Sequence, residues 1–349
     1  MMFLCSTVPA KMFFLRLNAR KKMNKFIVVN LDGNIHCLRK KDIEKLLKIN
    51  ASVIEIKNEK ISFNIFKKAD AIIFTKTKIT KEIIDNLERC RIIVRCGTGL
   101  DNIDVEAATE KKIMVSRVVE FCTEEVSNHA FMLILACSRK LKKFSKFVYK
   151  DLSTEDFGYI GGIKEETLGL VGFGKIARAL AGKAKSFGME VIGYDPFIDI
   201  DVFNKFGVKK VSLNTVLKAS DYVSLHCPLT QQTYHLIGEK ELKTMKKTAY
   251  LINTSRGSLI DESALIKALK KNYIAGAGLD VFEKEPPSRK NPLLHMENVI
   301  CTAHYAYYSN RSIDVLKDTV VNEIIRALKG KIPLNLYNTE VLKDPSFQK

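Results

Sequence analysis

A glycine-rich loop follows a short apolar run and precedes a segment with helical character. The loop consists of Gly172, Phe173, Gly174, Lys175, Ile176 and Ala177. In this pattern the first glycine permits a tight turn, the second lets the backbone approach a pyrophosphate, and the small third residue lets the helix pack closely on the strand. The N-terminus of the helix then faces the negative charge of the ligand. The spacing therefore predicts a dinucleotide-binding loop.

A carboxylate ends the next apolar run. Asp195 lies 21 residues after Gly174, where it can accept hydrogen bonds from the ribose of an adenosine. The same charge would repel a 2′-phosphate, so Asp195 favours NAD over NADP. The alternative is that the Tyr-Asp-Pro segment is only a turn.

Three further polar residues lie far apart in the sequence, each at or just beyond the end of an apolar run: Arg256, Glu285 and His304. Open α/β sheets bind ligands at the carboxyl ends of their strands, so these side chains can meet in one crevice. An arginine holds a planar carboxylate by two parallel hydrogen bonds. His304 could protonate a carbonyl oxygen as a hydride arrives, and Glu285 could orient the ring and stabilise the imidazolium. The set predicts hydride transfer to a 2-oxo acid; the alternative is a structural histidine and a simple Arg-Gly turn.

Strands and helices must place these residues at one edge of a sheet. The first β-branched runs cover residues 26–29, 52–56, 71–75, 91–96 and 113–118. Apolar runs separated by helical segments are typical of buried parallel strands, because helices cover both faces of such a sheet. We therefore predict a flavodoxin-like first domain. Residues 123–150 then form one long helical pattern.

A second alternating series follows. Its six apolar runs cover residues 167–173, 189–195, 222–226, 248–255, 274–282 and 299–304. Six strands with crossover helices predict a Rossmann-like sheet. The last helix, over residues 311–329, has no following strand, and we expect it to return to the first domain.

The predicted fold class is thus α/β, with a Rossmann NAD-binding domain inserted into a flavodoxin-like substrate domain. The substrate domain covers residues 23–123 and is completed by residues 309–337, and the NAD-binding domain covers residues 124–308. Residues 338–349 are expected to form a tail. Residues 1–22 are apolar and basic, but charged residues and a proline interrupt any signal-peptide core, so we interpret them as an extension outside the fold.

Composition supports a folded protein of about two domains. The chain has 349 residues, of which 46% are hydrophobic and 28% charged, which excludes a disordered or collagen-like protein and exceeds a usual domain size of roughly 150 residues. The net charge of +18 comes without an Arg-rich block or a Lys/aromatic alternation. We interpret it as a solvated surface and expect no nucleic-acid partner. No run approaches the length of a membrane span.

The eight cysteines form neither a CxxC pair nor a Cys/His cluster with metal-ligand spacing. We therefore expect no metal site and no disulfide framework. This usage of cysteine is typical of a reducing compartment, so we expect a cytoplasmic protein.

Over residues 25–337 the chain resembles the NAD-dependent D-2-hydroxyacid dehydrogenases. The motifs that carry the resemblance are RCGTGLDNIDVEAATEKKIMV, CTEEVSNHA, TLGLVGFGKIARALAGKAKSFGMEVIGYDP, VSLHCPLTQQTYHLI, LINTSRGSLIDESALIKAL, AGAGLDVFEKEPP and ICTAHYAYYS. Agreement over so many motifs is far more specific than any single one. The last motif and the helix after it are most similar to the branch of C-terminal-binding proteins and their prokaryotic dehydrogenase relatives.

The resemblance implies a role for each matching residue. It makes Arg256 the substrate-binding arginine, His304 the acid/base and Glu285 its partner. It also implies that backbone amides of Thr98 and Gly99 hold the substrate carboxylate, where glycine lets the chain approach an anion. The positions that it implies for NAD are Thr98, the loop from Gly172 to Ala177, Asp195, Cys227, Pro228, Leu229, Thr230, Thr233, Thr254, Ser255, Arg256, Asp280 and His304. Family members are generally dimers or larger, so we expect a homodimer with the long helical pattern as its arm.

Two positions depart from the family pattern. The usual Thr-Pro-His reads Thr302-Ala303-His304, so the turn before the histidine loses a restraint on φ. The usual Trp of the final motif is Tyr307. Neither change excludes activity.

Three functions remain open. The first is reduction of a compact 2-oxo acid such as glyoxylate, pyruvate or hydroxypyruvate. The second is D-3-phosphoglycerate dehydrogenase activity, for which Arg95 or nearby lysines could bind the phosphate; we rank it lower because the chain stops near Lys349 without room for a regulatory domain. The third is an NAD-sensing, corepressor-like binding protein, against which we count the lack of an extended disordered tail and of a nuclear-type basic cluster.

Overall fold

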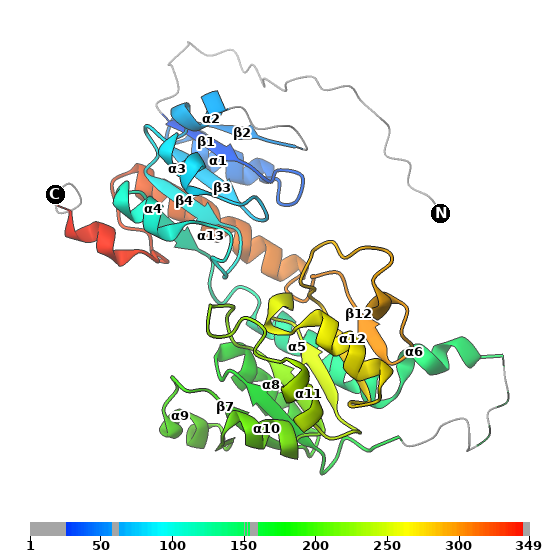
Figure 1. The fold of residues 1–349 in the computed structure, drawn as a ribbon. Coiled ribbons are helices and arrows are strands. Elements are labelled where there is room, and N and C mark those ends of the chain that lie inside the picture. Colours follow the sequence, from blue (N-terminus) through cyan, green and yellow to red (C-terminus); the bar gives the residue numbers. More distant parts are fainter. Residues whose placement is uncertain (1–25, 58–62, 150, 152, 154–159, 345–349) are drawn as a thin grey trace.

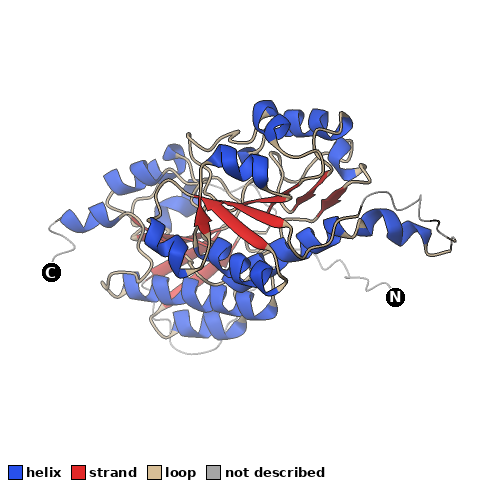
Figure 2. Ribbon diagram, turned by 90° about the horizontal axis from the view of Figure 1, so that it is seen from below, coloured by secondary structure: helices blue, strands red, loops and turns tan. Residues whose placement is uncertain are grey.

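The computed structural model describes residues 26–57, 63–149, 151, 153 and 160–344. The prediction for residues 1–22 lies outside the described residues. Figure 1 shows two lobes, each built around its own sheet, and Figure 2 shows helices surrounding the strands of both.

The first sheet is parallel throughout, with the strand order β2-β1-β3-β4-β5. Its strands are β1 (Phe26–Asn30), β2 (Ala51–Glu55), β3 (Ala71–Phe74), β4 (Ile92–Arg95) and β5 (Met114–Arg117). This order is that of flavodoxin-like sheets. The central strands β3 and β4 are apolar on consecutive residues because helices cover both of their faces. The prediction of a flavodoxin-like sheet is confirmed.

Short helices connect these strands. They are α1 (Lys40–Leu47), α2 (Phe63–Lys68), α3 (Lys81–Asp85) and α4 (Val105–Glu110). Polar caps set their first residues: Thr80 accepts a hydrogen bond from the backbone of Ile83, and Asp104 accepts one from the backbone of Ala107.

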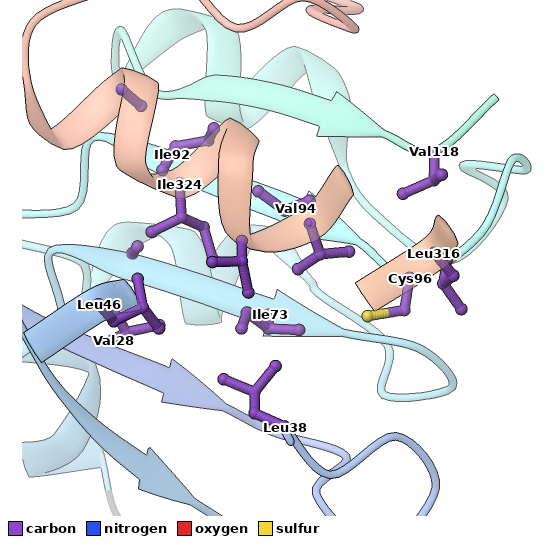
Figure 3. Packing of buried hydrophobic residues seen from close by; sticks show 14 of the residues in the cluster. Val28, Leu38, Leu46, Ile73, Ile92, Val94, Cys96, Val118, Leu316 and Ile324 are labelled. Atoms are coloured by element: carbon purple, nitrogen blue, oxygen red, sulfur yellow. The ribbon is translucent and has the colours of Figure 1, made fainter. Parts of the chain in front are cut away.

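The last helix, α13 (Asn310–Leu328), lies on the first sheet and packs against β4, β3, β5 and α1. Figure 3 shows Ile324 of α13 beside Ile92 of β4 and Leu316 of α13 beside Cys96, and all four belong to one buried cluster. The predicted return of this helix to the first sheet is confirmed. It begins at residue 310 because Ser309 caps it, accepting a hydrogen bond from the backbone of Ser312.

The segment after residue 337, expected to be a tail, instead packs on the first sheet as far as it is described. It contains a 3-10 helix, η4 (Thr339–Lys343), and Val341 joins the buried cluster. The side-chain oxygen of Asn338 accepts a hydrogen bond from the backbone of Val115, and its amide donates to the carbonyl of Ile113. These bonds satisfy backbone groups along strand β5.

The second sheet is also parallel throughout and has the order β12-β11-β10-β9-β6-β7-β8. Its strands are β6 (Thr167–Val171), β7 (Glu190–Tyr194), β8 (Lys209–Lys210), β9 (Tyr222–Leu225), β10 (Tyr250–Asn253), β11 (Gly276–Leu279) and β12 (Val299–Cys301). The predicted six strands are all present. The seventh, β8, was missed because it consists of two lysines at the sheet edge and has no apolar run.

The helices of this lobe are α5 (Thr123–Ser138), α6 (Leu141–Phe144), α8 (Lys175–Ser186), α9 (Ile200–Lys205), α10 (Leu213–Ala219), α11 (Glu239–Thr244) and α12 (Glu262–Lys270). The described residues of this lobe also form three 3-10 helices: η1 (Ser145–Phe147), η2 (Gly257–Leu259) and η3 (Pro292–Leu294).

The prediction of one helix over residues 123–150 is wrong. Helix α5 ends at Ser138, and Lys140 adopts a left-handed conformation with φ of 47° before α6 begins. A left-handed residue cannot continue a right-handed helix, and nothing in the residue types marks this position in advance. Helix α5 does span the second sheet, packing on α8, β10, β11 and β12.

The architecture is therefore α/β, with the Rossmann-type sheet inserted in the chain between strand β5 of the flavodoxin-like sheet and helix α13, which packs on that sheet. The exact domain limits stay a prediction. Among the described residues, no helix is both long and apolar enough to cross a membrane. In the same part of the chain, no group of His, Cys, Asp and Glu could hold a metal ion.

Candidate active site

The carboxyl edge of the second sheet gathers most of the predicted site residues. Because all its strands run parallel, the loops that follow them open at the same edge. The predicted residues follow in this order: the glycine loop after β6, Asp195 after β7, Cys227 to Thr233 after β9, Thr254 to Arg256 after β10, Asp280 and Glu285 after β11, and His304 after β12.

The glycine loop has the geometry that a dinucleotide needs. Gly172 has φ of 88°, and a Cβ there would lie 2.6 Å from the backbone nitrogen of Cys227, so a larger residue would not fit. A Cβ at Gly174 would meet nothing within 4 Å, so its backbone faces open space at the N-terminus of α8. That space and the helix N-terminus suit a pyrophosphate.

Asp195 holds the glycine loop. One carboxylate oxygen accepts a hydrogen bond of 2.8 Å from the backbone of Phe173, and the other accepts one of 2.9 Å from the backbone of Phe197. A carboxylate oxygen can accept more than one hydrogen bond, so both keep capacity for ribose hydroxyls. The negative charge beside the loop is the feature expected to favour NAD over NADP.

The loops after β9 and β10 are tied to each other. The Ser255 hydroxyl of the loop after β10 donates to the carbonyl of Cys227 in the loop after β9 at 3.0 Å. Within the loop after β9, the Thr233 hydroxyl donates to the carbonyl of Pro228 at 2.7 Å. The Thr254 hydroxyl is buried and has no hydrogen-bond partner within the described residues. A buried polar group without a partner is costly, so Thr254 fits a site that a polar ligand completes. Leu229 and Thr230 lie on the loop after β9. The hydroxyl oxygen of Thr233 accepts a hydrogen bond of 2.7 Å from the backbone of Thr230 and so closes a turn in this loop.

Arg256 reaches across to the first lobe. Its Nε donates a hydrogen bond of 3.0 Å to a carboxylate oxygen of Asp101, which follows β4 of the first sheet. Its Nη1 donates to the carbonyl of Ser255 at 2.8 Å. The remaining Nη2 lies against Gly99, where a Cβ would collide with it. Glycine at position 99 therefore lets the backbone come close to this guanidinium.

His304 and Glu285 form a close pair. The Nδ1 of His304 lies 2.5 Å from a carboxylate oxygen of Glu285, which makes Nδ1 the donor and leaves Nε2 for a ligand. The other oxygen of Glu285 accepts from the backbone of Phe282. Burial raises the pKa of Glu285, but the hydrogen bond and charge of His304, with smaller effects of the Phe282 backbone and Lys76, together outweigh it, so the net pKa lies below its ordinary value. Glu285 is thus ionised at neutral pH and can stabilise an imidazolium.

The backbone of His304 is in the left-handed region, with φ of 53°, a conformation that is uncommon for residues other than glycine. Asp280 holds it there. The carbonyl of Asp280 accepts from the backbone of His304 at 2.8 Å, and its carboxylate accepts from the hydroxyl of Thr302 at 2.6 Å and from the backbone of Ala306 at 3.0 Å. Asp280 is 1% exposed, and its hydrogen bonds hold the backbone of this turn in place. The contact with nicotinamide that the resemblance implies stays a prediction.

The first lobe contributes the loop after β4. The Thr98 hydroxyl donates to the carbonyl of Val118 at 2.9 Å. The backbone N–H groups of Thr98 and Gly99 donate no hydrogen bond to another group in the described part of the chain. Two such free donors beside an arginine are suited to an anion.

Two residues at the site were not singled out from the sequence. Asp101 contacts Arg256, and Lys76 lies near enough to Glu285 to contribute to lowering its pKa. Both follow strands of the first sheet, so the same strand-end rule could have found them. It was applied to the second sheet alone.

This geometry can be set beside known proteins. Residues 131–306 match the sequence model of a family described as D-isomer specific 2-hydroxyacid dehydrogenase, NAD binding domain. Over 284 residues the chain is 41% identical to the glyoxylate reductase of Thermococcus litoralis, an alignment that covers 79% of this chain and 86% of that one. The chain belongs to the D-isomer-specific 2-hydroxyacid dehydrogenase family.

Two further relatives extend the comparison. The chain is 39% identical to the D-3-phosphoglycerate dehydrogenase of Methanocaldococcus jannaschii over 276 residues, covering 78% of this chain and 52% of that one. The solved structure of the D-lactate dehydrogenase of Aquifex aeolicus, complexed with NAD and lactic acid, superposes with a TM-score of 0.77 at 30% identity, covering 87% of this chain and 96% of that one.

Membership in the family confirms the chemistry predicted from the residues. The protein is an NAD-dependent oxidoreductase that transfers a hydride between nicotinamide and a small 2-hydroxy or 2-oxo acid. The similarity to the branch of C-terminal-binding proteins stays a prediction.

Proposed function

We propose that this dehydrogenase reduces a compact 2-oxo acid such as glyoxylate, using NADH. The observation that carries the proposal is the pair of His304 and Glu285, in which Nδ1 is engaged at 2.5 Å and Nε2 is left for the substrate. Arg256 follows β10 and His304 follows β12, and β11 alone separates these strands. A substrate carboxylate bound by Arg256 and a substrate carbonyl oxygen bound by His304 would therefore occupy neighbouring positions at this edge of the sheet.

Each protein group then has a defined task. Arg256 and the free amides of Thr98 and Gly99 bind the substrate carboxylate. His304, protonated and held by Glu285, gives its Nε2 proton to the carbonyl oxygen, and the imidazole takes it back when the hydroxy acid is oxidised. Bound NADH supplies the hydride to the carbonyl carbon.

The residues around the cofactor support the choice of NAD. The open backbone at Gly174 would hold the pyrophosphate, Asp195 the adenosine ribose, and Thr254 a polar group of the nicotinamide half. A 2′-phosphate placed near Asp195 would face a carboxylate of the same charge, which is unfavourable.

NADH oxidation by purified protein against glyoxylate, pyruvate, hydroxypyruvate and 3-phosphohydroxypyruvate, with NADPH in parallel, tests the proposal. We expect kcat/KM to be highest for an unphosphorylated acid and at least about 5-fold higher with NADH than with NADPH, since two like charges at close range cost about 1 kcal/mol or more. Preference for the phosphorylated acid would favour the phosphoglycerate dehydrogenase instead. Tight NADH binding without turnover of any of the four acids would contradict the proposed substrate.

We also propose that the protein is a homodimer that uses the segment after α5. Figure 2 shows this segment projecting away from the body of the molecule, and it carries exposed apolar side chains, with Val148 77% and Tyr149 99% exposed. Exposed apolar side chains on a projecting segment favour an interface. Light scattering should give twice the chain mass of 39.5 kDa, and Tyr149→Asp should lower this mass at micromolar concentration. A wild-type mass of one chain would contradict the dimer.

A further inference from the structure

Two arginines of different sheets come together at the cleft. Arg95 ends β4 of the first sheet and Arg256 follows β10 of the second. Burial and then the charge of Arg256 lower the pKa of Arg95, so the two guanidinium groups are within electrostatic reach of each other. Two positive charges at close range repel each other, so a negatively charged group must lie near both arginines to offset the repulsion.

The loop between them is built to fit both guanidinium groups. Gly97, with φ of 144°, lies against Arg95, and a Cβ at this position would come within 3.0 Å of the Arg95 Cζ. Gly99 lies against Arg256 in the same way, with the Arg256 Cζ at 3.0 Å from the position of a Cβ. The backbone can pass this close to both side chains because the two positions lack a Cβ.

Asp101 ends this loop and supplies the negative charge. Its Oδ1 accepts from the Nε of Arg256 at 3.0 Å, and its side chain is 35% exposed. Burial is the largest influence and raises the pKa of Asp101, but the charge of Arg256 and the hydrogen bonds to the carboxylate together lower it below its ordinary value, so the carboxylate stays ionised at neutral pH. The charge of Arg95 lowers this pKa further, which means that Asp101 compensates both arginines.

The way in which Asp101 binds leaves the end of the guanidinium free. Nε donates to Asp101 and Nη1 gives one hydrogen to the carbonyl of Ser255. The second hydrogen of Nη1 and both hydrogens of Nη2 have no acceptor in the described part of the chain. Both terminal nitrogens thus keep at least one hydrogen that a carboxylate can accept, as binding by two parallel hydrogen bonds requires.

We propose that Asp101 is a positioning residue of the reaction: it holds the Nε of Arg256 from the opposite lobe and thereby directs the free end of the guanidinium at the substrate carboxylate. The inference rests on the proposed role of Arg256. In this role Asp101, a residue of the first lobe, acts on the substrate only through Arg256. Since Asp101 takes the Nε edge alone, the substrate binds beside it and does not displace it.

Steady-state kinetics with glyoxylate and NADH test the inference. Asp101→Ala should raise KM by about 10-fold, the low end of the cost of losing a hydrogen bond to a charged group, because both side chains are partly exposed, with a smaller change in kcat. Asp101→Asn should recover much of this loss, because its side-chain oxygen still accepts from Nε. The dissociation constant of NADH should stay within about twofold of wild type in both variants, since Asp101 touches no residue of the glycine loop. If the alanine variant is recovered unfolded, Asp101→Ser replaces it.

Asp104→Asn is the matched control. It removes the same charge three residues further on, where the side chain caps α4 and Asn is an equally good cap. Its KM should equal that of wild type. An unchanged or lowered KM in Asp101→Ala would overturn the inference, and a lowered one would identify Asp101 as a competitor for the arginine. If Arg256→Gln also leaves KM unchanged, the substrate role of Arg256 fails with it; if Arg256→Gln raises KM, the role of Asp101 alone fails.

Discussion

Replacing His304 by glutamine should lower kcat for 2-oxo acid reduction by about 100-fold or more, since general acid catalysis commonly contributes that much. The amide can still form hydrogen bonds but cannot deliver a proton to the carbonyl oxygen. The loss should therefore be in kcat. NADH binding, measured by fluorescence titration, should stay nearly unchanged, because the glycine loop and Asp195 follow other strands of the sheet.

The chain offers a close control for this variant. His235 also lies 2.5 Å from a glutamate oxygen, that of Glu283, in a neighbouring loop. His235→Gln therefore breaks a similar ion pair without removing the proton donor, and its kcat should stay within about twofold of wild type. A His304→Gln variant that turns over as fast as His235→Gln would refute the proton-donor role.

Much of the fold was predictable because its signals are local. Runs of consecutive apolar residues separated by helical segments identified every strand except β8, since a buried parallel strand must be apolar on both faces. The end of α5 was not predictable. It depends on the left-handed conformation of Lys140, which a lysine does not signal.

The cofactor side of the site was easier to predict than the substrate side. The glycine loop and Asp195 lie on consecutive strands, so their spacing along the chain reflects their spacing in the structure. The contact between Asp101 and Arg256 joins two sheets and residues 155 positions apart. No spacing rule reports such a contact, because it depends on how the two lobes face each other.

The change from proline to Ala303 shows how a departure from the family pattern is accommodated. A proline would restrain the turn before His304, yet the histidine still adopts its left-handed conformation. The hydrogen bonds that Asp280 accepts from both sides of the turn supply the restraint. The sequence suggested a loosened turn, whereas the structure shows that a buried carboxylate from the neighbouring strand holds it.

Replacing Arg256 by glutamine should lower kcat/KM for glyoxylate by about 100-fold or more, because each hydrogen bond to a charged group contributes about 1.5 to 3 kcal/mol and the fork provides two. Most of the loss should appear as a higher KM. Arg256→Lys should recover part of it, since an ammonium keeps the charge but cannot form the planar fork. The lysine variant thus separates the contribution of charge from that of geometry.

Arg326→Gln serves as the control for this pair. The Nε of Arg326 donates to the carbonyl of Ile332 at the C-terminal end of α13, outside the site described above, so the kinetic constants of this variant should equal those of wild type. If Arg256→Lys were as active as wild type, charge alone would bind the substrate and the orientation of the guanidinium would be irrelevant. If kcat/KM of the lysine variant is well below that of wild type, substrate binding depends on a fixed orientation of the guanidinium plane. Two hydrogen bonds fix that plane, one to the carbonyl of Ser255 in the second lobe and one to Asp101 in the first lobe. Substrate affinity would then depend on the two lobes being in contact.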